Sequence, residues 1–335
     1  ELEIGERSAR GEGLKGTYLD GPFEISVRPG ATRAGSAASI LLEGEGRAAG
    51  EKLPAVIGLP ATIRMAGSTA WKLQGRLEQP ARGAPWTTHV EVESNLGGLG
   101  IDAPRPFAKQ PDEPRPTRVA LDVPRPGQTN LRIATGSARA LLEFARGNDE
   151  RWRLERGAAR FDGQAPARPT RPGLHVGGDW PEFDLAEWLA LRAGAPGGRR
   201  LADWLGPVDV PLDRARVLGF EFLDVTARLE PGAASWRVVA SGPMAEGTVS
   251  IPADFAGSEP LALDMRKLVL QAAPAVPAGQ SQETSDPREL PAIAARVEEF
   301  TWQGRRFGRL DAQLDRAPQG LRLARLATEA PAFTL

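Results

Sequence analysis

The sequence has no cysteine, one tyrosine, two histidines and three methionines among 335 residues. The lack of cysteine excludes disulfide bonds, a thiol nucleophile and thiolate metal ligands. No apolar run reaches the roughly 18 residues that a membrane-spanning helix needs. The 42 basic and 43 acidic residues give a net charge of −1, and the basic residues are scattered. Because no basic patch is present, we expect no binding to nucleic acid.

Residues that could carry out chemistry are also scarce. His89 and His175 are far apart, and neither lies in a metal-binding motif such as HExxH. The glycines at positions 44–50 do not fit a phosphate-binding spacing, and no GxSxG motif is present. Glu298-Glu299 are adjacent in a predicted strand, where neighbours point to opposite faces, so they cannot form a facing acid/base pair. We therefore expect no catalytic residues, no bound metal and no cofactor, and we do not expect an enzyme.

Glycine and proline are abundant instead, with 38 and 30 residues. They interrupt the sequence every several positions, which is typical of many short strands joined by turns. The clearest strand is residues 69–78, where Trp71, Leu73, Gly75 and Leu77 alternate with charged or amide side chains. This period of two predicts a strand with one apolar face and one charged face.

The same pattern recurs in residues 296–314. Phe300 and Trp302 share one strand face, Gln303-Gly304 suits a two-residue turn, and the return strand puts Leu310 and Leu314 on one face. Further alternating segments predict strands at residues 13–19 and 22–28, joined by a turn at Asp20-Gly21, and at 38–45, 87–93, 118–123, 130–134, 139–144, 151–156, 215–217, 219–223, 225–229, 236–240, 248–251, 261–270 and 320–326.

Helical sequence is limited. Residues 184–192 predict a helix capped by Asp184, with Glu187 completing a capping-box-like pair. Shorter helices are expected at residues 51–59 and 201–205. Residues 104–116 predict a loop, and residues 272–289 predict a mobile one. We expect a mainly β protein, an elongated and curled antiparallel sheet shaped like a groove or taco, with a first segment at residues 1–195 and a second at 196–335.

Several motifs carry a family resemblance. The chain contains, in this order, GTYLDGP, AGSTAWKLQG, PGLHVGGDWPEFDLAEWLAL, PRELPAIAARVEEFTWQGRRFGRL and GLRLARL. Together these motifs resemble the YhdP family of AsmA-like bacterial envelope proteins. The resemblance implies long curled sheets with a hydrophobic inner channel, anchored in the inner membrane, crossing the periplasm and implicated in phospholipid transfer to the outer membrane. It also implies a periplasmic segment of a longer chain, whose other segments are partners and make the membrane contacts.

An apolar sheet face must be covered by a second sheet, by helices or by an apolar ligand. Helices are too few, so the sequence leaves open a closed sandwich, with the tryptophans in its core, or an open groove that holds acyl chains of phospholipid. If a groove exists, its predicted lining is Trp71, Leu73, Leu77, Val90, Val92, Leu121, Val123, Leu131, Ile133, Trp152, Leu154, Phe220, Phe222, Trp236, Val238, Phe300, Trp302, Leu310 and Leu314.

Overall fold

The computed structural model shows a mainly β protein, as expected, with only short helical segments. The chain forms two compact units. The first unit comprises residues 1–103, 107–175 and 194–197, and the second comprises residues 104–106, 176–193 and 198–335. The structure describes residues 3–5, 9–31, 37–57, 62–188, 205–232, 235–252, 259–271, 291–330 and 333–334.

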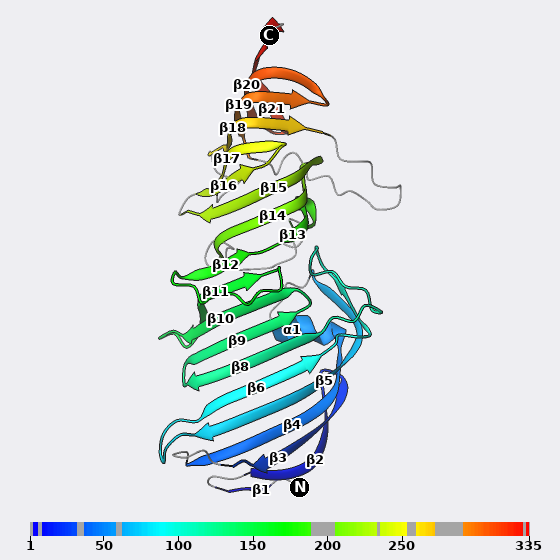
Figure 1. Ribbon diagram of the computed structural model, residues 1–335, viewed down its shortest axis with the longest axis vertical. Coiled ribbons are helices and arrows are strands. Elements are labelled where there is room, and N and C mark those ends of the chain that lie inside the picture. Colours follow the sequence, from blue (N-terminus) through cyan, green and yellow to red (C-terminus); the bar gives the residue numbers. More distant parts are fainter. Residues whose placement is uncertain are drawn as a thin grey trace. The chain divides into compact units, whose positions relative to one another are not determined.

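The strands of the first unit are antiparallel, and each pairs with the next in the order given at the end of this paragraph (Figure 1). One additional strand, β7 (Leu99–Asp102), pairs with the start of β5 and was not predicted. The paired series is β1 (Glu3–Ile4), β2 (Ala9–Tyr18), β3 (Gly21–Pro29), β4 (Ala38–Ala49), β5 (Arg64–Gln79), β6 (Thr87–Ser94), β8 (Thr117–Arg125), β9 (Gln128–Thr135), β10 (Ala138–Arg146) and β11 (Trp152–Arg160).

The chain passes through β12 (Gly173–Gly177) into the second unit, where each strand again pairs with its successor. Neither β12 nor β13 was predicted. The series is β13 (Trp180–Asp184), β14 (Leu205–Val217), β15 (Phe220–Pro231), β16 (Ser235–Ser241), β17 (Ala245–Pro252), β18 (Leu261–Leu270), β19 (Ile293–Trp302), β20 (Arg305–Ala317), β21 (Gly320–Ala330) and β22 (Phe333–Thr334).

Two strand pairs correct the expectation of a wholly antiparallel sheet. β13 and β14 are parallel, and so are β18 and β19. A parallel pair requires the chain to return to the starting end of its neighbour, which needs a long connection. The connection from Leu270 to Ile293 contains residues 272–289, predicted as a mobile loop, which lie outside the described residues. A long polar segment between two strands therefore indicates a crossover here.

The helical predictions are met in part. Residues 50–57 form the 3-10 helix η1 (Gly50–Lys52) and the helix α1 (Leu53–Ile57), close to the predicted helix at 51–59. Residues 185–188 are helical, and the remainder of the predicted helix at 184–192 lies outside the described residues. The carboxylate of Asp184 accepts a hydrogen bond from the Ala186 amide at 2.9 Å, as expected of a cap. The helix predicted at 201–205 is wrong at Leu205, which begins β14.

The first hairpin turns one residue earlier than predicted. Leu19 and Asp20 occupy the turn with φ of 52° and 54°, and Tyr18 pairs with Gly21. The prediction placed the turn at Asp20-Gly21. Instead, Gly21 allows a close approach of strands, since a Cβ there would lie 2.1 Å from the carbonyl oxygen of Arg47.

Several strands are longer than the alternation indicates. Apart from Gly219, which lies in the preceding turn, the predicted strands at 219–223 and 225–229 are both part of β15. The alternation breaks between them because Asp224 has a φ of 52°. β14 likewise begins ten residues before the predicted start at 215. Local interruptions such as this one look like strand ends in the sequence, although the hydrogen-bonded ladder continues past them.

The second unit narrows along one side. β16 and β17 are shorter than their neighbours, so the start of β15 reaches the end of β18 directly. The Glu221 amide donates a hydrogen bond to the Gln271 carbonyl oxygen at 3.3 Å. In addition, the rings of Phe220 and Trp302 meet edge to face with centroids 5.6 Å apart. At this side, β15 therefore contacts the ends of β18 and β19, although β16 and β17 lie between them in the order of strands.

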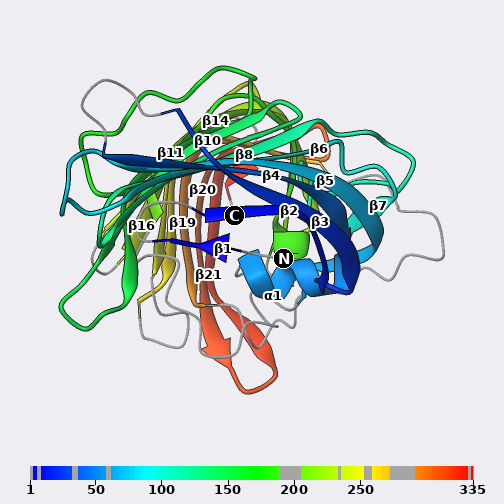
Figure 2. The ribbon, with the colours of Figure 1, turned by 90° about the horizontal axis from the view of Figure 1, so that it is seen from below.

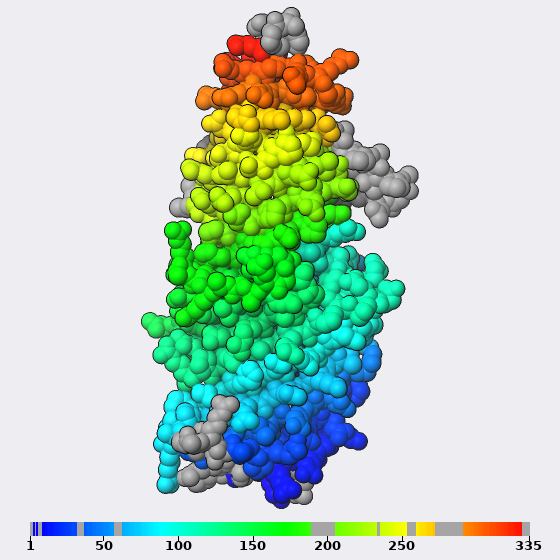
Figure 3. All heavy atoms as spheres, viewed as in Figure 1, coloured from blue at the N-terminus to red at the C-terminus, as the bar shows by residue number. Residues whose placement is uncertain are grey.

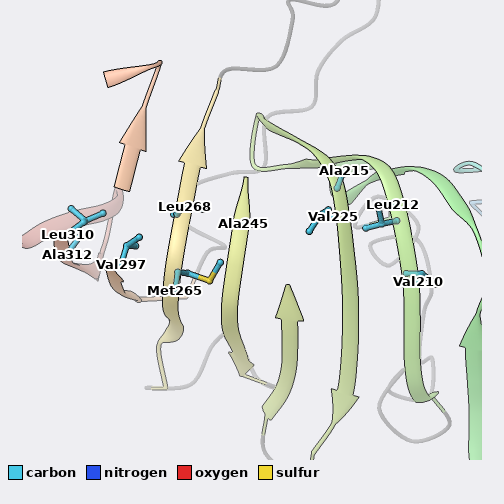
Figure 4. Close-up of a cluster of buried hydrophobic side chains, with 10 residues drawn as sticks. All are labelled: Val210, Leu212, Ala215, Val225, Ala245, Met265, Leu268, Val297, Leu310 and Ala312. Atoms are coloured by element: carbon cyan, nitrogen blue, oxygen red, sulfur yellow. The ribbon is translucent and has the colours of Figure 1, made fainter. Parts of the chain in front are cut away.

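A cluster of ten buried residues forms the core of the second unit (Figure 4). Its members come from six strands, and the most deeply buried is Val297, which is 2% exposed. Half-buried side chains, including Phe222 and Phe300, pack around it. The buried members are Val210, Leu212, Ala215, Val225, Ala245, Met265, Leu268, Val297, Leu310 and Ala312.

Candidate apolar binding faces

Strand register brings the predicted lining residues of the first unit onto one face. Leu73 pairs with Val92, Val90 pairs with Leu121, and Leu121 pairs with Leu131. Directly paired residues point to the same side of a sheet, so the alternation of each strand is in phase with the next. The first apolar face consists of Trp71, Leu73, Leu77, Val90, Val92, Val119, Leu121, Val123, Leu131, Ile133, Leu142, Trp152 and Leu154.

The second unit has an equivalent face. Val238 pairs with Leu229 and Val249, while Ala295 pairs with Leu263 and, on its other side, with Ala312. The parallel pair β18–β19 keeps this phase as well as the antiparallel pairs do. The second apolar face consists of Phe220, Phe222, Ala227, Leu229, Trp236, Val238, Val249, Leu263, Met265, Ala295, Val297, Phe300, Trp302, Leu310, Ala312 and Leu314.

Most of these side chains are only partly shielded from water. Of the predicted lining residues, Leu310 alone is buried, at 8% exposed. Trp152 and Trp302 are 46% and 40% exposed, and all the others are half-buried. A second sheet packed on these faces would bury them as a sandwich core does. The exposure of the predicted lining thus differs from that of a sealed core.

Glycines make the first apolar face flat. Large side chains lie across glycines of the adjacent strand: a Cβ on Gly16 would lie 2.6 Å from the Phe23 ring, and one on Gly46 would lie 2.7 Å from the Trp71 ring. Gly75 receives the side chain of Leu42 in the same way, at 3.1 Å. Gly75 was predicted on this face together with Trp71 and Leu73, whereas Gly16 and Gly46 were not predicted to belong to it. Their effect is a surface of low relief.

One end of the first apolar face is covered. Ala48 and Thr69 pair with each other two positions beyond Gly46 and Trp71, and they are 3% and 4% exposed. Here η1 turns over the face, and a Cβ on Gly50 would lie 2.7 Å from the side chain of Leu99 in β7. Figure 2 shows α1 on the inner side of the curving strands β3 to β5. The first apolar face is therefore the inner face of its unit.

A buried lysine anchors this cover. Lys109, in the predicted loop 104–116, is 3% exposed, and its ammonium donates hydrogen bonds to the carbonyl oxygens of Leu99 and Gln110, each at 2.8 Å. Burial lowers the pKa of Lys109, which the nearby Glu113 carboxylate partly opposes. The hydrogen bond to the Leu99 carbonyl oxygen ties the loop to β7.

Part of the second apolar face carries an aromatic cover. The indole of Trp188, from the helical turn at 185–188, lies 5.6 Å from the Trp180 ring and is stacked 6.5 Å from the Phe183 ring. Trp180 pairs with Leu212, and Phe183 pairs with Ala215, both of which are buried. The sequence identified the helix but not that its tryptophan lies on the sheet. Nearby, burial and the Asp184 carboxylate raise the pKa of Glu187.

The opposite face of the first unit carries cross-strand ion pairs. Arg118 on β8 bridges Glu91, at 3.2 Å, and Glu93 on β6. Asp122 accepts a 2.6 Å contact from His89, and Arg132 of β9 contacts the same carboxylate at 2.9 Å. His89 thus lies on the charged face of the sheet, among these cross-strand contacts. In the space-filling view of Figure 3, β6 to β11 form adjacent bands coloured from cyan to green.

Glu143 is the most buried carboxylate of this surface, at 8% exposed. Arg168 donates two hydrogen bonds to it, one of 2.9 Å, and Arg156 lies 3.4 Å away. The hydrogen bond from Arg168 holds the pKa of Glu143 below its ordinary value against the opposing effect of burial. The pair fastens residue 168 to the middle of β10.

The sequence predicts no metal site, no facing acid/base pair at Glu298-Glu299 and no membrane-spanning helix. Within them, no group of three or more histidine and acidic side chains is placed to hold a metal ion. Glu298-Glu299 do not alternate as assumed, because the register shifts between Val297 and Phe300, and both carboxylates are exposed. Among the described helices, none has the length and apolarity to cross a membrane.

Comparison with known proteins identifies the family. A family model described as YhdP protein matches residues 1–335, the whole chain. No curated protein matches the sequence, and no solved structure does. The chain belongs to the YhdP family.

Proposed function

We propose that this chain is a periplasmic segment of an AsmA-like, inner-membrane-anchored envelope protein whose apolar faces shelter phospholipid acyl chains in transit between the two membranes. It acts without catalysis, and it contributes to the outer-membrane barrier. The observation that carries the proposal is the in-phase, partly exposed apolar lining, in which Leu310 alone of the predicted residues is buried. Family membership supports the envelope assignment.

The physical need for such a surface is large. Exposing acyl chains to water costs about 0.8 kcal/mol per CH₂, so a two-chain phospholipid crossing water would face a barrier on the order of 20 kcal/mol. Contact with aliphatic and aromatic side chains removes much of that cost. The flat surface over Gly16, Gly46 and Gly75 presents few ridges to a moving chain. Weak, unspecific contacts of this kind favour sliding over tight binding.

A structural module with a closed core is the second candidate. The ten buried residues around Val297 favour it for the second unit, because they already form a shielded core. In this reading the apolar faces only stabilise the fold, and bound lipid is not expected. The two candidates therefore differ in lipid content and in their response to a charge placed on the first apolar face.

The test uses the chain of residues 1–335 incubated with phospholipid vesicles, re-isolated, and analysed for bound lipid by mass spectrometry. Leu73→Asp places a charge on the first apolar face, and Gln74→Asp places the same charge one residue away on the other face. We expect phospholipid on the wild type and on Gln74→Asp, and much less on Leu73→Asp, with urea midpoints measured for all three.

A wild-type chain that stays free of lipid would contradict the proposal. So would a Leu73→Asp chain that remains folded and binds as much lipid as Gln74→Asp. The closed-core alternative predicts a third pattern: no lipid on any chain, and a loss of several kcal/mol of stability in Leu73→Asp, because a buried unpaired charge is costly.

A further inference from the structure

Aromatic rings gather at one end of the second apolar face, beside the turn Gln303-Gly304. The Trp302 ring contacts the Phe220 ring edge to face at 5.6 Å and lies 6.4 Å from the Phe300 ring. The Phe307 ring is 5.9 Å from that of Phe300. These four residues form an aromatic collar, and Trp302, which is 40% exposed, is its outermost member.

Arg305 lies beside the collar on the same face. It pairs directly with Trp302 across the turn, so both side chains point to the apolar side, and Arg305 is exposed. Within the described residues, Arg305 makes no ion pair. Some other arginines of the second unit are paired: Arg228 contacts Asp209 at 2.7 Å, and Arg266 donates a 2.6 Å hydrogen bond to Glu246. The guanidinium at the collar is thus available to an anion.

We propose that the collar and Arg305 form a binding site for the phosphate headgroup of a phospholipid whose acyl chains lie on the second apolar face. An amphiphile on this face must keep its headgroup at the edge, in water. A tryptophan suits such a boundary because it has an apolar body and one polar N–H group. A guanidinium binds phosphate through two parallel hydrogen bonds, which an ammonium cannot do. The site therefore favours phospholipids over uncharged lipids with the same chains.

This inference rests on the proposed function, but an experiment can refute the inference while the proposed function stands. The chain offers a matched control, because Arg306 pairs with Thr301 and points to the opposite face. Arg306 is also exposed and also makes no ion pair within the described residues. Arg305→Gln and Arg306→Gln remove the same charge from neighbouring positions, and only the former changes the collar side.

The experiment offers the 335-residue chain equal amounts of phosphatidylglycerol and diacylglycerol with identical acyl chains in one vesicle preparation. The bound lipids are then quantified by mass spectrometry. We expect the wild type and Arg306→Gln to favour phosphatidylglycerol, and Arg305→Gln to reduce that preference up to about five-fold, the upper range for an exposed charge pair. Inorganic phosphate without lipid should not bind measurably at millimolar concentration.

Each other outcome overturns the inference. Equal binding of both lipids by the wild type, or equal changes in the two variants, removes the headgroup site while acyl-chain binding stands. Binding of inorganic phosphate to the lipid-free chain would show that Arg305 binds free anions and not a lipid headgroup. A wild-type chain that binds neither lipid refutes the proposed function together with the inference. Urea midpoints within error of the wild type show that both variants are folded.

Discussion

The Trp71 indole lies across Gly46 of the neighbouring strand, so closely that a Cβ on Gly46 would stand 2.7 Å from the ring. Because Gly46 has no side chain, the Trp71 indole of the neighbouring strand can lie over it. The carbonyl oxygen of Pro22 would also be only 2.7 Å away, so the backbone closes the space from the other side. The strands around Gly46 are held at a spacing that admits hydrogen alone.

Gly46→Ala is expected to destabilise the chain by about 2 kcal/mol, within the range for overpacking. Gly75→Ala serves as the comparison on the same face, because its Cβ would meet only the movable side chain of Leu42, at 3.1 Å. We expect its cost to be less than half as large. Urea denaturation of both variants tests this, and equal costs would show that the contact with Trp71 and Pro22 relaxes freely.

Leu218→Asn is expected to stabilise the protein by about 1 kcal/mol. Leu218 and Gly219 form the β14–β15 turn with φ of 51° and 81°, and a leucine in the left-handed region is strained. Asn-Gly is the preferred pair for such a turn. Leu223→Asn is the control, since Leu223 is also exposed, at 39%, but is not in the left-handed region. A similar gain in both variants would point to hydrophobic exposure, not to strain.

The Glu143–Arg168 pair predicts a specific response to acid. Because Arg168 lowers the pKa of Glu143 in the folded state, the pair's stabilisation is complete above the ordinary glutamate pKa of about 4.3. It is lost as the pH falls through the lowered value. Thermal melts between about pH 5 and pH 2 should therefore fall more steeply for the wild type than for Glu143→Gln. Parallel curves would mean that the carboxyl titrates alike in both states.

Trp188→Ala is expected to uncover part of the second apolar face. Trp188 covers Trp180 and Phe183, which pair with the buried residues Leu212 and Ala215 of β14. If this face receives acyl chains, the variant should bind more lipid per chain than the wild type. Trp236→Ala removes part of the face itself and should bind less. Lipid quantification by mass spectrometry distinguishes them, and a decrease in both variants would show that Trp188 is lining, not cover.

Much of the sheet could be predicted because alternation is a local property. Leu73 and Val90 were placed on one face from their own strands alone, and the register then brought those faces together. The direction of β19 beside β18 could not be obtained in this way, since it depends on where a long connection returns. The turn at Leu19-Asp20 was displaced because no glycine marks it.

The candidate faces were predicted as sets of residues, but their covers were not. The helical pattern around Trp188 does not indicate which face of the sheet its side chain contacts. Likewise, Lys109 lies in a segment that looks like a polar loop, and its burial follows from backbone carbonyls supplied by Leu99 and Gln110. Such contacts join elements distant in sequence, and no periodicity encodes them.

The short hairpin β16–β17 has a consequence for how this protein can change in length. β15 already touches β18 past it and runs antiparallel to it, so loss of both strands would leave neighbours with compatible directions. Adding or deleting one such hairpin would lengthen or shorten the second unit by about 10 Å, the width of two strands. Gain or loss of whole hairpins would therefore change the length of the second unit in discrete steps.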